Sequence, residues 1–274
     1  MSPTPYKSRV YLLAARSAPR IVILQRKRSR LFHIISIETK KSRVEEGSWF
    51  RGKLYVGRCD ISFDGNFMVY LAMGATGNTW NGLCRLPRLK TLVSANNTGT
   101  YNGGGYFQGQ RLLRTNGWLD IDSRWPEYDH PFDLEPYKAE HGGDLGVIYA
   151  RLRRDGFVRR GGNWGEAARL PTKTYQVAQY RDDGWVSQRY RQLTVRYVGY
   201  LQHGYTFAFS LDDYPGLLDG ASWATWDACG QLWVARPGTV ERFTDRDLRR
   251  GTPSLTIDVD QFEPPQKVDA DSEV

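Results

Sequence analysis

A short motif occurs twice in this chain and constrains its fold more than any other feature. Both copies consist of an apolar strand, an Asp/Gly turn and a second apolar strand. They are Ile61-Ser-Phe-Asp-Gly-Asn-Phe-Met-Val-Tyr-Leu-Ala72 and Ala224-Thr-Trp-Asp-Ala-Cys-Gly-Gln-Leu-Trp-Val-Ala-Arg236. Asp and Gly tolerate left-handed backbone conformations and therefore close tight hairpins. The motif predicts a chain built from repeated β-hairpins.

The strand that follows the first turn, Phe67–Ala72, is apolar on both of its faces. Such a strand needs sheets packed on both sides. Weaker copies of the motif surround Asp155-Gly156, at 147–159, and Asp183-Gly184, at 175–187. We expect hairpins there as well.

Composition favours sheets over helices. The 28 Gly, 16 Tyr and 9 Trp residues provide frequent turns and many aromatic strand formers. Helical turns are expected only near 241–250 and 162–169, and 74–117 is expected to be a long irregular stretch. The apolar segments near the N-terminus predict three strands, at 9–16, 20–25 and 31–37.

The hairpins resemble propeller blade strands, through Phe63-Asp64-Gly65 and Trp226-Asp227 with Gly230. Together with Gly103–Gly105 they are similar to a group of uncharacterised bacterial proteins with β-propeller-like repeats. The resemblance implies an all-β, propeller-like fold and no particular activity. At roughly 40–50 residues per four-stranded blade, the chain would hold about five blades. A two-sheet β-sandwich is the alternative. We expect a single domain at 1–263, with an acidic insert at 119–145 and a polar tail at 264–274.

Charge is distributed unevenly along the chain. Residues 1–118 hold 19 Lys/Arg and 5 Asp/Glu, residues 119–145 hold 2 and 8, and residues 146–274 hold 17 of each. A locally basic surface favours an anionic partner, although charged residues also solvate strand edges and discourage edge pairing. Both interpretations stay open from the sequence.

Two basic turns are the candidate contacts for such a partner. The first is the predicted turn 26–30, and the second follows the third strand at 40–43. Their cations are Arg26, Lys27, Arg28, Arg30, Lys40, Lys41 and Arg43. If both turns lay at one end of the sheet, they would form a single patch for phosphates or acidic protein surfaces.

A glycine run flanked by aromatic residues is a candidate ligand rim. Consecutive glycines allow a backbone to pass close to a bulky group. The candidate rim residues are Trp80, Tyr101, Gly103, Gly104, Gly105 and Tyr106. A loop crossing the top of the sheets is the plainer interpretation. No dinucleotide or P-loop spacing occurs in this stretch.

No motif predicts a catalytic, metal or cofactor site. The acidic insert combines eight acids with His130 and His141, but it lacks EF-hand and H-E-x-x-H spacing. We expect it to pair with the basic part of the chain or with a basic partner. His33 is expected to be a packed strand residue. Cys59, Cys84 and Cys229 lack disulfide-framework or zinc spacing, which predicts three buried thiols in a reducing cytoplasm.

These observations leave three classes of function. The first is a non-catalytic interaction module that presents basic and aromatic loops to a macromolecular partner, most simply a protein. The second is sequence-independent nucleic-acid binding by the basic N-terminal half. The third is a hydrolase that acts on a glycan or another small substrate in a loop-rimmed pocket. No secretory or membrane-spanning segment is expected, since no apolar run reaches the ~20 residues that a membrane helix needs.

Overall fold

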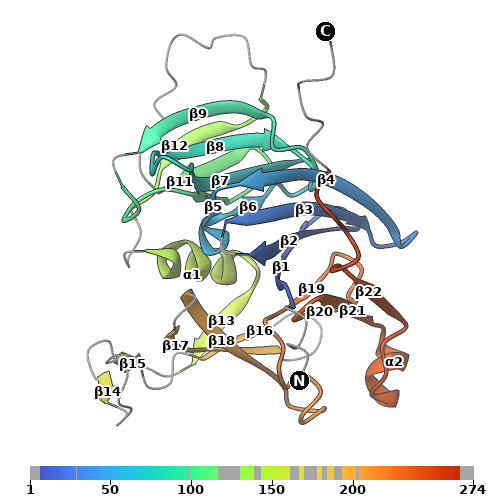
Figure 1. The fold of residues 1–274 in the computed structure, drawn as a ribbon. Coiled ribbons are helices and arrows are strands. Elements are labelled where there is room, and N and C mark those ends of the chain that lie inside the picture. The colour runs from blue at the N-terminus through green and yellow to red at the C-terminus, as the bar shows by residue number, and fades with distance from the viewer. Residues whose placement is uncertain are drawn as a thin grey trace, which may run out of the picture.

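The computed structural model describes residues 7–28, 30–97, 99–116, 130–138, 143–160, 167–169, 178–180, 184–187, 193–201 and 204–265. Within these residues the chain is all-β, with several antiparallel sheets and few helices (Figure 1). This agrees with the fold class expected from the repeated hairpins.

The first sheet is an antiparallel meander of four strands. They are β1 (Arg9–Ala14), β2 (Arg20–Arg28), β3 (Leu31–Glu38) and β4 (Arg43–Arg51). All three N-terminal strands expected from the sequence are present. The expected turn at 26–30 is shorter than predicted, because β2 continues through Arg28 and β3 begins at Leu31.

The second sheet contains the first copy of the motif. Its elements are β5 (Lys53–Leu54), the 3-10 turn η1 (Val56–Arg58), β6 (Asp60–Ile61), β7 (Phe67–Met73), β8 (Thr79–Arg85) and β9 (Thr91–Asn97). Strands β6 and β7 pair across the Asp64-Gly65 turn, so the first predicted hairpin is confirmed. Gly65 has a φ of 72°, and Asp64 Oδ1 accepts a hydrogen bond of 3.0 Å from the Asn66 N–H.

The stretch 74–117 is not the irregular segment that the sequence suggested. It contains β8 and β9, and it continues into a third sheet made of β10 (Gly105–Phe107), β11 (Leu112–Thr115) and β12 (Asp133–Pro136). Polar residues inside β8 concealed the strand pattern. Asn81 and Gly82 are both buried there, and a Cβ on Gly82 would lie 2.4 Å from the Tyr70 ring.

The first weaker motif copy was wrongly predicted to be a hairpin. Residues Asp144–Arg154 form helix α1, and Asp155-Gly156 ends that helix instead of joining two strands. Apolar residues recur at helical spacing on its buried side, namely Leu145, Ile148, Tyr149 and Leu152. The Asp-Gly pair is common to hairpin turns and helix ends, so it does not distinguish them.

A fourth sheet follows helix α1. It is formed by β13 (Phe157–Arg160), β16 (Gly184–Ser187), β17 (Leu193–Leu201) and β18 (Gly204–Leu211), while β14 (Ala167–Arg169) pairs with β15 (Ala178–Tyr180). Within the described residues, β15 pairs with β14 and β16 pairs with β13 and β17, so the hairpin expected between β15 and β16 is not seen there, and the turn 181–183 lies outside those residues. The helical turn expected at 162–169 is wrong for 167–169, and 162–166 lies outside the described residues.

The last sheet contains the second copy of the motif. It is formed by β19 (Trp223–Trp226), β20 (Leu232–Arg236), β21 (Thr239–Phe243) and β22 (Leu255–Asp258), with helix α2 (Asp245–Arg250) before β22. Strands β19 and β20 pair around Asp227 and Gly230, which confirms the second predicted hairpin. Helix α2 confirms the helical tendency near the C-terminus, and a capping box between Thr244 and Asp247 begins it.

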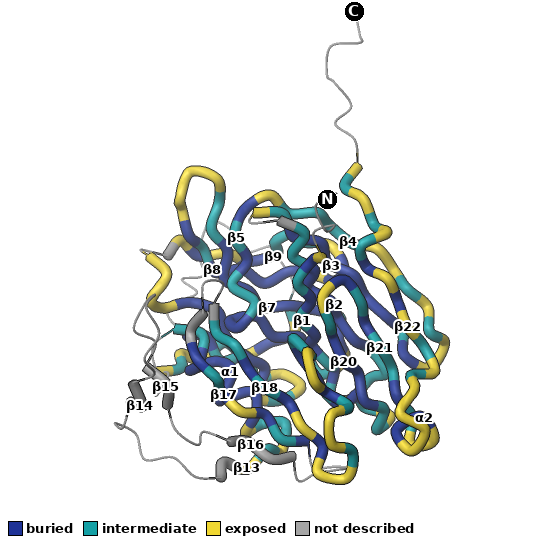
Figure 2. The backbone as a smooth tube through the Cα atoms, turned by 60° about the horizontal axis from the view of Figure 1, so that its bottom comes forward, coloured by how far each residue is buried: buried dark blue, intermediate teal, exposed yellow. Residues whose placement is uncertain are grey.

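The sheets pack face to face and share buried layers (Figure 2). One face of the first sheet packs with helix α1, the fourth sheet and the last sheet. Its other face packs with the second sheet. The opposite face of the second sheet packs with the third sheet. As predicted, the two faces of β7 are both buried, with Val69 in one cluster and Met68 in the other.

Contacts between successive sheets form a closed circuit. They run from the first sheet to the second and third, then through α1 to the fourth. Strand β18 of the fourth sheet contacts β19 of the last sheet, and β1 of the first sheet contacts β19 and β20. This circuit is consistent with a propeller-like arrangement, and a sandwich-like stack of several sheets is consistent with the same contacts. Among the described residues, no helix has the length and apolar character needed to span a membrane.

Candidate functional site

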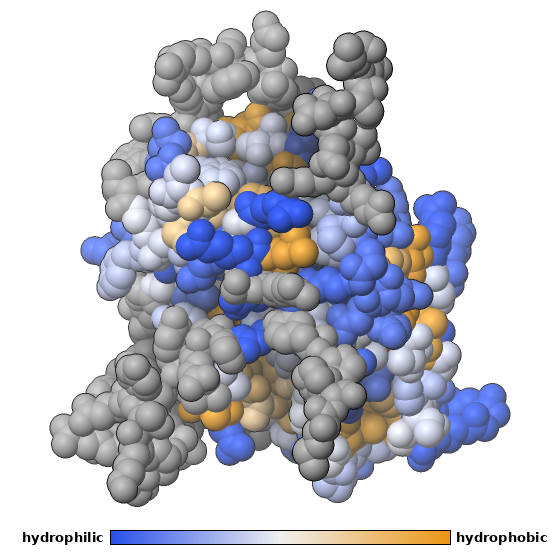
Figure 3. Space-filling view, viewed as in Figure 1, coloured by the Kyte–Doolittle hydropathy of each residue, from blue (hydrophilic) through white to orange (hydrophobic). Residues whose placement is uncertain are grey.

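A cavity of about 940 Å³ lies where the circuit of sheets meets helix α1. Residues of β1, β2, β3, β5, η1, β18 and β19 line it, together with one side of α1. We call this cavity the central pocket. Figure 3 shows hydrophilic side chains over the middle of one face of the molecule, interrupted by small hydrophobic areas.

The central pocket is strongly basic. Five of its lining residues are cations, and one is a carboxylate. The cations are Arg9, Arg26, Lys53, Arg58 and Arg151, and the carboxylate is Asp144. Positive charge gathered in a concave site raises the local concentration of anions.

Among the cations that line the pocket, Arg58 is the most deeply buried, and its pairing is incomplete. Its side chain is 3% exposed, and its Nε donates to Asp144 Oδ1 at 2.9 Å. Its Nη1 is buried and has no hydrogen-bond partner. An unsatisfied buried donor costs free energy, so this nitrogen marks a place where an anionic ligand would be stabilised.

Asp144 links the cations of the pocket electrostatically. Burial raises the pKa of its carboxyl group, while the charges of Arg58 and Lys53 act to lower it. Burial also raises the pKa of the Tyr11 phenol, with Arg9 and Arg26 acting in the opposite direction and Asp144 in the same direction. Tyr11 therefore lies within the electrostatic field of Arg9, Arg26 and Asp144.

Arg9 and Arg26 face each other directly across strands β1 and β2. Like charges in such a cross-strand pair repel each other. The guanidinium carbon of Arg26 lies 5.8 Å from the centre of the Phe32 ring, which supports one side of the pair. A bound anion would offset the repulsion between these two arginines.

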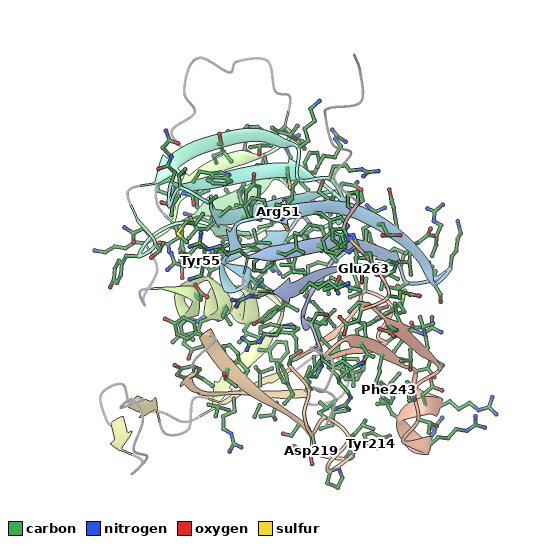
Figure 4. The ribbon with its side chains drawn as sticks, viewed as in Figure 1. Arg51, Tyr55, Tyr214, Asp219, Phe243 and Glu263 are labelled. Carbon is green, nitrogen blue, oxygen red and sulfur yellow. The ribbon has the colours of Figure 1, made fainter. Side chains whose placement is uncertain are left out.

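Aromatic rings line the same cavity. The Nζ of Lys53 lies 4.4 Å from the centre of the Tyr55 ring, and Arg151 lies 5.9 Å from that of Trp223. Tyr101 is 74% exposed and borders the pocket. In Figure 4, Tyr55 lies beside helix α1.

Helix α1 is fixed to the second sheet by buried charges. Asp60 is 1% exposed and pairs with Arg154, and its Oδ1 lies 3.4 Å from Arg151 Nε. Arg151 also donates to the Cys59 carbonyl oxygen at 2.9 Å. These contacts hold the pocket wall that carries Asp144.

The glycine run contacts the protein itself and supports Arg58. The Gly104 N–H donates to Asn81 Oδ1 at 2.8 Å, and Gly104 has a φ of 76°. A Cβ at this position would lie 2.3 Å from the Arg58 carbonyl oxygen. Gly103 donates to Asn116, and a Cβ on Gly105 would meet the Arg114 backbone. The sequence predicted that this backbone passes close to another group, and for Gly104 that group is the backbone of η1.

The remaining candidate rim residues differ in position. Tyr101 borders the central pocket. Trp80 instead packs against the ring of Phe50, and its Nε1 donates to the Tyr70 hydroxyl at 3.4 Å. Tyr106 is 9% exposed and packs edge-to-face against Tyr137. Only one of the three predicted aromatic residues therefore lies at the pocket.

The two basic turns do not form one patch. They lie at opposite ends of β3, since one joins β2 to β3 and the other joins β3 to β4. Lys40, Lys41 and Arg43 are exposed at the second turn, where Glu38 pairs with Lys41 at 3.4 Å and with Arg43 at 3.1 Å.

The first turn is divided between two environments. Arg26 lines the central pocket, whereas Lys27 donates to the Phe262 carbonyl oxygen and to Glu263 Oε1, both at 2.6 Å. Arg30 is exposed beside a hollow of about 590 Å³ that Arg51 and Glu263 also line (Figure 4). The side chain of Arg28 lies outside the described part of the structure.

Several pocket residues were not singled out from the sequence. They are Arg9, Tyr11, Lys53, Tyr55, Arg58 and Arg151. The alternation of Arg9 and Tyr11 with apolar Val10 and Leu12 was a usable signal for one solvated strand face. No local pattern connects these two residues with Arg58 or Arg151.

The acidic insert was expected to pair with the basic part of the chain and not to bind a metal. Among the acids of the insert, Glu135 pairs with Arg114 at 2.8 Å and Asp144 with Arg58, so for these two the expected pairing with the basic part of the chain is observed. Most other residues of the insert lie outside the described ranges. Within those ranges, no group of three or more His, Cys, Asp or Glu residues could hold a metal ion.

The three cysteines are free, but they are not all buried. Cys59 and Cys84 are buried, and burial raises the pKa of Cys84 to about 12. Cys229 is exposed because it lies in the turn between β19 and β20, which corrects the expectation of three buried thiols.

No protein-family model matches this chain, and no curated protein matches it. Two crystal structures have a distant likeness to it. The uncharacterized protein lmo1340 from Listeria monocytogenes EGD-e is 7% identical, with 87% of this chain and 81% of that chain covered and a TM-score of 0.34. A mutant of AofleA from Arthrobotrys oligospora, with three arginines replaced by alanine, is 10% identical, with 92% and 73% covered and a TM-score of 0.23. At these TM-scores neither likeness supports an assignment.

Proposed function

We propose that this protein is a non-catalytic binding module that holds a small anionic molecule in its central pocket. The observation that carries the proposal is the excess of cations in the lining, with a buried, unpartnered nitrogen on Arg58. Two of the five cations, Arg58 and Arg151, are buried and the other three are partly buried, so an anion bound among them would offset part of the cost of removing their charges from water. The proposal includes a propeller-like ring of sheets around the pocket and a cytoplasmic location.

The central pocket is a better candidate site for an anionic ligand than the two basic turns are. The turns lie at opposite ends of a strand, and Lys27, Lys41 and Arg43 already have acidic partners. A protein partner or a nucleic acid bound at these turns would meet separate groups of charge. Both stay alternatives to the pocket.

A hydrolase is less well supported by this geometry. Glycoside hydrolysis commonly requires two carboxyl groups facing the same bond. Among the described residues that line the pocket, Asp144 is the single carboxylate, and Arg58 holds it in an ion pair. Binding therefore accounts for the pocket more simply than acid–base catalysis does.

Thermal unfolding with low-millimolar citrate or inorganic phosphate tests the proposal, with sodium chloride at equal ionic strength as the reference. A ligand that binds the folded state raises the midpoint of unfolding. We expect citrate or phosphate to raise the midpoint of unfolding of the wild type above the sodium chloride reference. This rise should be largely lost in the double variant Arg26→Gln, Lys53→Gln. The matched control Lys40→Gln, Arg43→Gln removes the same charge from the exposed turn and should keep the rise.

An equal rise in both double variants, or no rise beyond sodium chloride, would contradict pocket binding. A single-stranded oligonucleotide tests the main alternative in parallel. If its affinity falls in the Lys40, Arg43 variant and persists in the Arg26, Lys53 variant, the basic turns are the functional surface and the pocket proposal is wrong.

A further inference from the structure

We infer that the ligand of the central pocket is a phosphate monoester that carries a flat ring, with the phosphate on the Arg9 and Arg26 side and the ring against Tyr101. This inference rests on the proposed function and specifies the chemistry of the ligand. It depends on the opposed arginines, the unpartnered Arg58 nitrogen and the exposed aromatic ring at one edge of the cavity.

The opposed arginines favour a doubly charged, compact head group. Arg9 and Arg26 are direct partners in the β1–β2 register, so both side chains leave the same face of the sheet, and both line the cavity. Guanidinium groups present planar pairs of donors that match phosphate oxygens, and two arginines can share one phosphate. A single negative charge would offset less of their mutual repulsion.

Arg58 provides a further donor within the same cavity. Its unpartnered Nη1 is buried, and the Arg58 Nε is already used by Asp144. Tyr11 experiences the charges of Arg9, Arg26 and Asp144, and Asp144 is also the ion-pair partner of Arg58. A phosphate has enough acceptor oxygens to accept from more than one of these groups.

Tyr101 indicates what the rest of the ligand contains. Its ring is 74% exposed and borders the cavity, and Tyr55 provides a second ring in the lining. An exposed aromatic ring beside a basic pocket provides a surface on which another flat ring stacks. A phosphate joined to an aromatic or heterocyclic ring matches both features.

Ligand-detected NMR titration of the full chain tests this inference with four probes: phenyl phosphate, inorganic phosphate, phenyl sulfate and benzoate. We expect phenyl phosphate to bind at least about tenfold more tightly than phenyl sulfate, its singly charged counterpart. Its affinity should also fall as the pH drops through about 6, where a phosphate monoester gains a proton.

Variants separate the two parts of the inferred site. Arg26→Gln should weaken both phosphates about tenfold or more. Tyr101→Ala should weaken phenyl phosphate severalfold while leaving inorganic phosphate unchanged, and Tyr101→Phe should retain the wild-type affinity. Lys40→Gln serves as the charge-matched control on the exposed turn and should change neither.

The outcomes distinguish this inference from the proposed function. If citrate or benzoate depends on the pocket arginines while phenyl phosphate has no advantage over phenyl sulfate, pocket binding stands and the phosphate assignment is wrong. If Tyr101→Ala weakens inorganic phosphate as much as phenyl phosphate, the ring assignment is wrong. If no anion depends on Arg26, both ideas fail.

Discussion

His33 is a titratable residue with no exposed surface, placed in the middle of strand β3. Its ring stacks on Trp49 at a centroid distance of 4.0 Å, and neither ring nitrogen has a hydrogen-bond partner. Lys27 lies near His33, and Gln25 is the cross-strand partner of His33 on β2. Glu46 Oε2 is 3.9 Å from His33 Nε2. Burial, assisted by Lys27, lowers the pKa of His33 from 6.5 to about 4.

This lowered pKa predicts acid sensitivity between pH 6.5 and about 4. In that window the unfolded chain binds a proton at His33 and the folded chain does not, so the free energy of unfolding falls as the pH falls. Above pH 6.5 the contribution is constant. Urea unfolding measured at pH 7.5 and at pH 4.5 should show a fall in the free energy of unfolding, of which about 2–3 kcal/mol is due to His33.

The variant His33→Phe provides the comparison for this prediction. It keeps a flat ring on Trp49 and removes two buried polar atoms without partners, so its stability at pH 7.5 should equal or exceed that of the wild type. Between pH 7.5 and 4.5 it should lose about 2–3 kcal/mol less than the wild type. Equal losses in the two proteins would show that His33 is not the group responsible.

The glycine run is the element that connects the third sheet with the central pocket. Gly104 combines a φ of 76° with a site where a Cβ would lie 2.3 Å from the Arg58 carbonyl oxygen. Gly104→Ala should therefore destabilise the protein by about 2 kcal/mol or more, measured by urea unfolding. It should also weaken anion binding, because the backbone of Arg58 must move.

Gly109 provides a matched control for this prediction. A Cβ at Gly109 would meet nothing within 4 Å. Gly109→Ala should change the free energy of unfolding by less than about 0.5 kcal/mol and leave anion binding unchanged. Similar effects of the two substitutions would contradict the packing role of Gly104.

Elements that depend on local chemistry were predictable from the sequence. Asp64 and Asp227 each accept a hydrogen bond from the backbone N–H two residues later, so four or five residues suffice to specify each hairpin turn. Helix α1 was missed because Asp155-Gly156 was interpreted as a hairpin turn. The helical spacing of Leu145, Ile148 and Leu152 was present in the sequence and would have corrected it.

The pocket could not be predicted in the same way, because packing of whole sheets assembles it. Its five cations extend from Arg9 to Arg151 and lie on five separate elements. Sequence showed that residues 1–118 are basic, but not which of their cations converge. Arg26 and Tyr101 were predicted as candidates for different sites, and the fold brings both to one cavity.

Contacts between the two ends of the described chain close the circuit of sheets. Ser222 Oγ donates to the Val10 carbonyl oxygen at 2.7 Å, and Gln25 Nε2 donates to the Val259 carbonyl oxygen at 2.8 Å. Asp260 accepts hydrogen bonds from the backbone and the hydroxyl of Ser8, which is fully buried. Stability of the first and last sheets should therefore be coupled.

Asp260→Ala tests this coupling at the scale of the whole molecule. The substitution leaves the buried donors of Ser8 without their acceptor, so we expect a loss of about 2–3 kcal/mol in the free energy of unfolding. Asp212→Ala removes the same charge at an exposed position and should cost less than about 0.5 kcal/mol. Because the circuit is closed, hydrogen exchange should accelerate in both β1 and β20 of the Asp260 variant. Faster exchange confined to 255–265, with global stability unchanged, would mean that the C-terminal segment frays independently and does not close the circuit.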